Sequence, residues 1–240
     1  MLKYDTILWD LDGTLLDFKR MERYALEKCL GSVGVVMTQE RYALYSEINE
    51  GYWKRLERGE VKIKELLPGR FEQFFRQIGV EGMDPDEMQK RYERELGENT
   101  CRMEDSYGVV SKIKEMGLKQ HIVTNGTVAT QQAKMKNSGF DKLIDRVFIS
   151  EAIGAEKPQR EFFDSVFGEL TDLKKDRTLL VGDSLTSDMR GAYNAGVDAC
   201  FYNPKRKDRQ TGEGDPVRVA YEIASLHDII GILEQGDGKA

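Results

Sequence analysis

The sequence predicts an α/β protein, in which a doubly wound parallel sheet carries a bundle of helices inserted after its first strand. From about Cys101 onward, short apolar runs alternate with stretches of helical periodicity, which is the pattern of parallel strands joined by crossover helices. Between residues 19 and 99 the periodicity is helical throughout. We therefore expect a core formed by residues 1–18 and 100–240 and a helical domain formed by residues 19–99.

The expected strands of the core are short apolar runs. They cover residues 6–8, 121–123, 147–149, 178–181, 199–202 and, at the sheet edge, 219–223. Helices between them are expected to end at Gly117, Gly139 and Gly196, because glycine adopts the left-handed conformation that ends many helices. Residues 205–216 are expected to form a loop, and residues 235–240 a frayed tail.

Five helical segments are expected in the inserted domain. They cover residues 20–30, 38–56, 61–67, 71–78 and 84–96. Thr38 is expected to cap the second segment, and Asp84 followed by Pro85 is a typical start for the last one. Pro68 and Gly69 separate the third segment from the fourth, because a proline inside a helix removes a hydrogen bond.

Composition excludes several classes of protein. The 240 residues carry a formal net charge of −6 and no basic stripe, which argues against binding to nucleic acid. No apolar run is long enough to span a bilayer, and charges interrupt the first twenty residues, so we expect no membrane association. Three widely spaced cysteines indicate a reducing compartment. The expectation is a cytoplasmic monomer or homodimer.

Polar residues follow four of the predicted strands. In chain order these are Asp10 and Asp12, then Thr124, Asn125 and Gly126, then Lys157, and finally Asp183 and Asp188. Each group alone is compatible with an ordinary turn, since Asp, Asn and Gly are common turn residues. The carboxyl ends of parallel strands, however, lie at one edge of the sheet, where such proteins bind their ligands. We therefore expect these residues to converge on one site.

The charges of these residues indicate the chemistry of the site. Asp10, Asp183 and Asp188 repel one another when they are close, at about 4 kcal/mol per pair for a separation near 4 Å and an effective dielectric of about 20. A divalent cation removes this repulsion, and oxygen ligands without His or Cys favour Mg²⁺. Thr124, main-chain N–H groups and the Lys157 ammonium could hold a phosphoryl group. A carboxylate nucleophile would then form an aspartyl-phosphate that water hydrolyses.

The four sequence motifs resemble, in order, those of the haloacid dehalogenase superfamily. The matching stretches are Asp10-x-Asp12-Gly-Thr, Thr124-Asn-Gly, Lys157-Pro158 and Gly-Asp183-x-x-x-x-Asp188. The resemblance implies a Rossmann-like core and identifies the helical insertion as a mobile cap. It also implies that the chain is a Mg²⁺-dependent enzyme acting on a small molecule.

The resemblance implies a role for each of the acidic residues. Asp10 would be the nucleophile and a Mg²⁺ ligand. Asp12 would protonate the leaving oxygen, later activate water, and bind Mg²⁺ through its main-chain carbonyl. Asp183 would be a further ligand, and Asp188 would bind the metal directly or orient its water shell. Since dehalogenases and phosphonatases lack the aspartate found here as Asp12, the resemblance favours phosphate-ester chemistry.

The resemblance also implies a phosphate-binding set. Thr124 and Lys157 would bind the phosphate, with Lys157 also holding the nucleophile, and Asn125 and Gly126 would complete the substrate-binding turn. Stretches such as Thr124-Asn-Gly-Thr-Val and Phe201-Tyr-Asn-Pro are similar to the non-canonical pyrimidine 5'-nucleotidase branch of the superfamily. This narrower similarity implies a pyrimidine nucleoside monophosphate as substrate, with its base selected by the cap.

Other functions share parts of this pattern. A sugar-phosphate phosphatase or a β-phosphoglucomutase would use the same chemistry, although a mutase would not sustain phosphate release. A phospho-accepting signalling domain of the receiver type also combines acidic residues, Mg²⁺, a threonine and a lysine on a parallel sheet. The helical insertion and Asp12 argue against the receiver, which would form a stable phosphorylated state without turnover.

Overall fold

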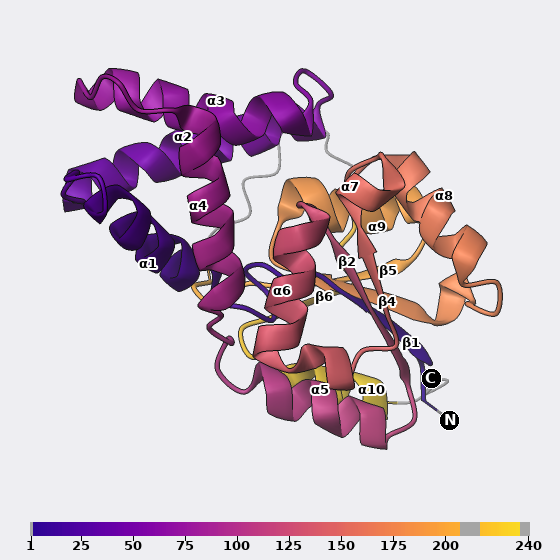
Figure 1. Cartoon of the computed structure of the whole chain (residues 1–240). Coiled ribbons are helices and arrows are strands. Elements are labelled where there is room, and N and C mark those ends of the chain that lie inside the picture. The colour runs from indigo at the N-terminus through magenta and orange to yellow at the C-terminus, as the bar shows by residue number, and fades with distance from the viewer. Residues whose placement is uncertain (1, 207–216, 236–240) are drawn as a thin grey trace. The chain divides into compact units, whose positions relative to one another are not determined.

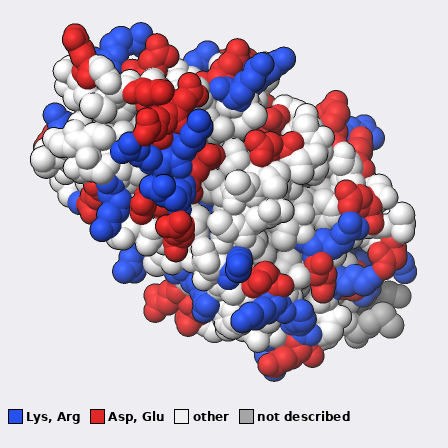
Figure 2. All heavy atoms as spheres, viewed as in Figure 1, with Lys and Arg blue, Asp and Glu red and all other residues white. Residues whose placement is uncertain are grey.

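The computed structural model describes residues 2–206 and 217–235, and its contacts divide the chain into two compact units. One unit is α/β and comprises Met1–Asp17, Arg102–Val128 and Ser138–Ala240. The other unit is helical and comprises Phe18–Cys101 together with Ala129–Asn137. Figure 1 shows the chain, and Figure 2 shows that basic and acidic side chains are interspersed on the face in view.

The α/β unit contains a parallel sheet, as the sequence predicts. Its strands are β1 (Thr6–Trp9), β2 (Lys119–Thr124), β3 (Arg146–Ile149), β4 (Thr178–Gly182), β5 (Asp198–Tyr202) and β6 (Tyr221–Ile223). They lie in the order β3-β2-β1-β4-β5-β6, with every neighbouring pair parallel. This is the order of a doubly wound sheet, in which β1 lies between β2 and β4. The predicted fold class is confirmed.

Helices and short turns connect these strands. They are α5 (Ser106–Glu115), α6 (Val128–Ser138), η1 (Phe140–Lys142), α7 (Ser150–Ile153), α8 (Arg160–Glu169), η2 (Lys175–Arg177), η3 (Leu185–Met189), α9 (Arg190–Ala195) and α10 (Asp228–Glu234). Apolar residues of the sheet, including Leu8, Val123 and Leu180, pack with Phe162 and Phe163 of α8 in a buried core.

The helical unit is built mainly from four helices. These are α1 (Phe18–Gly31), α2 (Gln39–Glu57), α3 (Ile63–Ile78) and α4 (Pro85–Glu98), with α1 packed on α4 and α3 packed on both α2 and α4. Two predicted caps are confirmed, since the Thr38 side chain accepts from the Arg41 N–H and the Asp84 side chain accepts from the Asp86 N–H. No helix within residues 2–206 and 217–235 is long and apolar enough to cross a membrane.

The predicted helix break at Pro68 and Gly69 is wrong, because α3 continues through both residues. Pro68 lacks the N–H that would bond to the carbonyl one turn earlier, but the buried Leu66 and Phe71 on either side keep the helix against its neighbours. Gly69 is where α2 approaches α3, since a Cβ atom there would lie 2.9 Å from the Tyr52 hydroxyl. Packing of the two helices therefore outweighs the local signal.

Other boundaries also differ from the sequence-based expectations. The helix expected to end at Gly196 begins as the π-helical turn η3 and continues into α9. The stretch after β3 forms the single helical turn α7. Most of the expected loop, residues 207–216, and nearly all of the expected tail, residues 236–240, lie outside the described residues.

A buried polar network links the helices of the helical unit. The Arg70 guanidinium donates to Asn49 Oδ1 at 2.6 Å and to Gln89 Oε1 at 2.8 Å. Asn49 in turn donates to Glu22 Oε1 at 3.0 Å. Burial raises the pKa of Glu22, and the nearby Arg70 charge opposes that shift. Arg70 thus stabilises an ionised carboxylate that burial would otherwise disfavour.

We predict that replacing Arg70 by alanine lowers the free energy of unfolding by about 3 kcal/mol, because it leaves Glu22 and two amides without their buried partner. Urea denaturation followed by circular dichroism measures this change. Arg76→Ala is the matched control, since Arg76 is an exposed arginine of the same helix, and it should change stability by less than about 0.5 kcal/mol. Equal effects of the two substitutions would contradict the role of the network.

Candidate active site

Asp10 is the first residue after β1, at the centre of the sheet. Its main-chain N–H donates to the Val181 carbonyl of β4 at 2.9 Å, which continues the strand pairing by one residue. The chain then turns at Gly13, whose φ of 100° lies in the region that favours glycine. Thr14 follows this turn, and its hydroxyl donates to Asp10 Oδ2 at 2.9 Å. A residue of its own loop therefore positions the buried Asp10 carboxylate.

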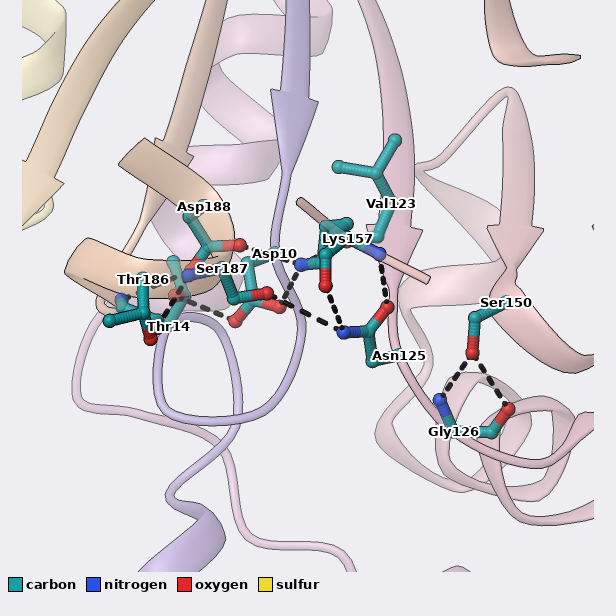
Figure 3. A network of polar contacts seen from close by, with 11 residues as sticks. Asp10, Thr14, Val123, Asn125, Gly126, Ser150, Lys157, Thr186, Ser187 and Asp188 are labelled. Atoms are coloured by element: carbon teal, nitrogen blue, oxygen red, sulfur yellow. Dashed lines mark hydrogen bonds and ion pairs between the residues drawn. The ribbon is translucent and has the colours of Figure 1, made fainter. Parts of the chain in front are cut away.

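Lys157 contacts two acidic residues that follow different strands, Asp10 after β1 and Asp188 after β4. Its ammonium donates to Asp10 Oδ1 at 2.8 Å, to Asp188 Oδ1 at 2.6 Å and to the Val123 carbonyl at 2.8 Å. Only about 1% of Lys157 is exposed, so these three oxygens replace the water that an ammonium normally binds. Figure 3 shows the ammonium between Asp10 and Asp188, beside the end of β2.

Three carboxylates converge at this edge of the sheet. Asp10, Asp183 and Asp188 each offer an oxygen, and these oxygens lie within 4.8 Å of one another. The main chain makes room for them, because a Cβ atom on Gly13 would lie 2.5 Å from the Asp183 carboxylate and one on Gly182 would lie 2.3 Å from that of Asp188. Asp188 Oδ2 also accepts from the Ser184 N–H at 3.1 Å. Glycine at positions 13 and 182 therefore leaves the space that the carboxylates of Asp183 and Asp188 occupy.

The proximity of these charges shifts their protonation. Burial raises the pKa of Asp10 to about 7, a shift that Lys157 opposes and that Asp188 and Asp12 reinforce. Desolvation and repulsion by Asp10 and Asp188 raise the pKa of Asp183 well above its usual range. Because Asp183 retains solvent exposure, we attribute its shift mainly to the neighbouring carboxylates. Burial lowers the pKa of Lys157, but Asp10 and Asp188 outweigh this effect and raise it.

The donor set fits a magnesium ion. The three clustered side chains offer carboxylate oxygens only, with no His or Cys among them, and their burial and mutual repulsion raise the pKa of Asp10 and Asp183. Hard oxygen ligands of this kind favour Mg²⁺ or Ca²⁺ over transition metals. The three carboxylates and one ammonium leave two negative charges, which a divalent cation would neutralise.

The residues of the expected phosphate-binding turn lie beside this cluster. Thr124 is the last residue of β2 and is buried. The Asn125 side chain contacts the main chain of Lys157, and the Gly126 N–H donates to Ser150 Oγ at 3.1 Å. Asp12 lies in the turn after Asp10 and is partly exposed. The structure therefore brings all the predicted strand ends to one edge of the sheet.

Some participants were not selected from the sequence. Thr14 lies within the first motif, and its position at the turn, four residues after Asp10, is the feature of the sequence that could have indicated its contact with Asp10. Ser187 precedes Asp188, and Ser150 begins α7 after β3. Their contacts, and that of the Val123 carbonyl, depend on how separate loops meet, so no local pattern in the sequence indicates them.

Comparison with known proteins agrees with this geometry. A family model described as a haloacid dehalogenase-like hydrolase matches residues 4–196, which include the four motifs that follow the strands. The chain belongs to the haloacid dehalogenase-like hydrolases. The family membership expected from the four motifs is thus confirmed.

Several relatives match this hydrolase over nearly its whole length. The HAD-hydrolase YfnB of Bacillus subtilis is 32% identical over 97% of each chain. A crystal structure of YfnB, described as bound to magnesium and as revealing interdomain movement, has a TM-score of 0.89 and covers 96% of this chain and 99% of its own. Pyrimidine 5'-nucleotidase PynA of Streptococcus pneumoniae is 32% identical, covering 97% of this chain and 96% of its own. Pyrimidine 5'-nucleotidase YjjG of Escherichia coli is 27% identical, covering 97% and 99%.

The close approach of the main chain to the carboxylates yields a prediction. Gly182→Ala would place a Cβ atom against the Asp188 carboxylate and displace it from Lys157, so hydrolase activity should fall by roughly 100-fold. Steady-state kinetics measures the loss. Gly108→Ala serves as the control because a Cβ atom there meets nothing within 4 Å, and it should leave activity unchanged. Full activity of Gly182→Ala would show that the position of Asp188 is not critical.

Proposed function

We propose that this hydrolase is a Mg²⁺-dependent phosphomonoesterase that acts through an aspartyl-phosphate, and that its substrate is a pyrimidine nucleoside 5'-monophosphate. The observation that carries the proposal is the buried Lys157 ammonium between Asp10 and Asp188. This contact favours the ionised form of Asp10 against the desolvation that raises its pKa. An ionised carboxylate is what a nucleophilic role for Asp10 requires.

The metal-binding role is assigned to the acidic cluster. Asp10, Asp183 and Asp188, with the main-chain carbonyl of Asp12, would hold the ion. A bound Mg²⁺ ion supplies positive charge that reduces the repulsion between these carboxylates and the anionic substrate. The fit of three carboxylate oxygens within 4.8 Å of one another supports this assignment.

The chemical steps follow from the placement of two aspartates in one turn. The Asp10 carboxylate attacks phosphorus, the bond from phosphorus to the ester oxygen breaks, and protonated Asp12 gives its proton to that leaving oxygen. Asp12, now ionised, takes a proton from water as the water oxygen attacks the phosphorus of the aspartyl-phosphate. Release of inorganic phosphate restores the Asp10 carboxylate and protonated Asp12, so the cycle balances.

We assign binding of the phosphoryl group to two residues, Thr124 at the end of β2 and Lys157 in the segment before α8. Thr124 would donate its hydroxyl, and the Lys157 ammonium would supply positive charge as negative charge develops on the phosphoryl oxygens. Both residues are buried beside Asp10, which supports this assignment. The Lys157 ammonium then has a double role, since it also contacts the nucleophile.

The substrate class rests on sequence similarity. Two relatives named as pyrimidine 5'-nucleotidases match nearly the whole chain, including the helical unit. Matches confined to the α/β part would support the chemistry but not the substrate. We assign selection of the base to the helical domain, predicted as residues 19–99, because the residues of the carboxylate cluster are suited to phosphate and metal.

The proposal predicts Mg²⁺-dependent phosphate release concentrated on UMP, CMP and dTMP. A panel of nucleoside monophosphates and sugar phosphates, assayed with Mg²⁺ and with a chelator, measures it. Asp10→Asn should reduce turnover by roughly 10⁴-fold while the protein remains folded, because an amide is not a nucleophile for phosphorus. Asp141→Asn, which alters an exposed aspartate far along the chain, should behave like the wild type.

Each outcome of this panel bears on a different part of the proposal. Turnover of sugar phosphates alone would keep the mechanism and remove the nucleotidase assignment. Substantial turnover by Asp10→Asn would contradict the choice of nucleophile. Undiminished activity in the presence of chelator would contradict the metal dependence.

A further inference from the structure

The Asn125 side chain forms a paired contact with the main chain of Lys157. Its Nδ2 donates to the Lys157 carbonyl at 3.0 Å, and its Oδ1 accepts from the Lys157 N–H at 2.9 Å. Nδ2 also lies 3.5 Å from Ser187 Oγ. Figure 3 shows Asn125 directed at Lys157 and Ser187, which come from two other loops of the site. One amide thus joins three segments that are distant in the sequence.

These contacts involve both polar atoms of the Asn125 side-chain amide, Nδ2 and Oδ1. An asparagine amide has two N–H donors and one carbonyl oxygen. Nδ2 donates to the Lys157 carbonyl and has Ser187 Oγ as a second, longer contact, while Oδ1 accepts from the Lys157 N–H. A phosphate group accepts hydrogen bonds, so it would have to displace one of these partners to bind the Asn125 side chain.

Residues at the end of β2 therefore contact both the main chain and the ammonium of Lys157. Asn125 binds its main chain, and the carbonyl of Val123, two residues earlier, accepts from its ammonium. A lysine side chain is four methylene groups long, so its ammonium can lie only within that reach of its main chain, which the Asn125 contact holds. The same ammonium contacts Asp10 and Asp188. The main chain and the ammonium of the nucleophile's cationic partner are therefore both anchored at the end of β2.

We propose that the Asn125 side chain positions Lys157 and does not itself bind the phosphate, so that only the main chain of this turn is left for the substrate. The inference rests on the proposed function for its kinetic consequence, although the contact itself can be tested without turnover. Removing the amide frees the Lys157 main chain and lets the ammonium shift relative to Asp10. Such a shift lowers the rate of the chemical step more than it weakens ground-state binding.

The experiment compares wild type, Asn125→Ala and Asn194→Ala. Asn194 is the matched control because its Nδ2 donates to the carbonyl of Pro158 at 2.8 Å, one residue from Lys157 but through an exposed side chain. We expect Asn125→Ala to lower kcat by about 10- to 100-fold, with KM and the inhibition constant of inorganic phosphate changed by less than about threefold. Asn194→Ala should match the wild type in all three values.

Hydrogen exchange supplies a measurement that does not need activity. The Lys157 N–H donates to Asn125 Oδ1, so its exchange should become faster in Asn125→Ala and stay unchanged in Asn194→Ala. Asn125→Asp keeps an acceptor for this N–H and loses the donor to the Lys157 carbonyl. The exchange rate of the Lys157 N–H in this variant should therefore lie between those of wild type and Asn125→Ala, which also covers the case in which the alanine variant does not fold.

Several results would overturn the proposal. A direct phosphate ligand would make Asn125→Ala raise the phosphate inhibition constant at least tenfold. A kcat of Asn125→Ala within twofold of wild type would show that the contact has no kinetic role. If the wild type releases no phosphate, the proposed function fails, while the exchange experiment still decides whether Asn125 holds Lys157.

Discussion

The contact on which the site depends is the one between the buried Lys157 ammonium and the carboxylates of Asp10 and Asp188. Asp10, Asp183 and Asp188 repel one another, and each unit charge pair at such distances is worth about 4 kcal/mol at an effective dielectric near 20. Lys157 offsets part of this repulsion from within the protein, through contacts of 2.8 and 2.6 Å. The remaining negative charge is what suits the site to a divalent cation.

The sheet brings these residues together. β1 pairs with β2 on one side and β4 on the other, all in parallel, so the residues after each strand meet at a single edge. The chain separates Asp10 from Asn125, and Asn125 from Asp188, by more than sixty positions. Hydrogen bonds to Lys157 nevertheless join their three loops. The central strand is thus both the middle of the core and the origin of the proposed nucleophile.

The sequence predicted the strands and the polar residues at their ends, because apolar runs and turn residues are local signals. It did not predict that α3 continues through Pro68, since the reason is packing against Tyr52 of another helix. It also could not indicate that the Asn125 amide is used by the Lys157 main chain, because that contact joins residues 32 positions apart. Residue type therefore located the candidate site, whereas only the tertiary contacts show which of its residues touch one another.

The most direct test of this account is to trap the phosphorylated enzyme. An acyl phosphate on an aspartate can be reduced by borohydride to homoserine, so rapid quenching during turnover of UMP, followed by reduction and peptide mass spectrometry, identifies the phosphorylated residue. The account predicts that Asp10 alone is converted, and only when Mg²⁺ and substrate are both present. Conversion of Asp12, or sustained turnover without conversion of any aspartate, would contradict it.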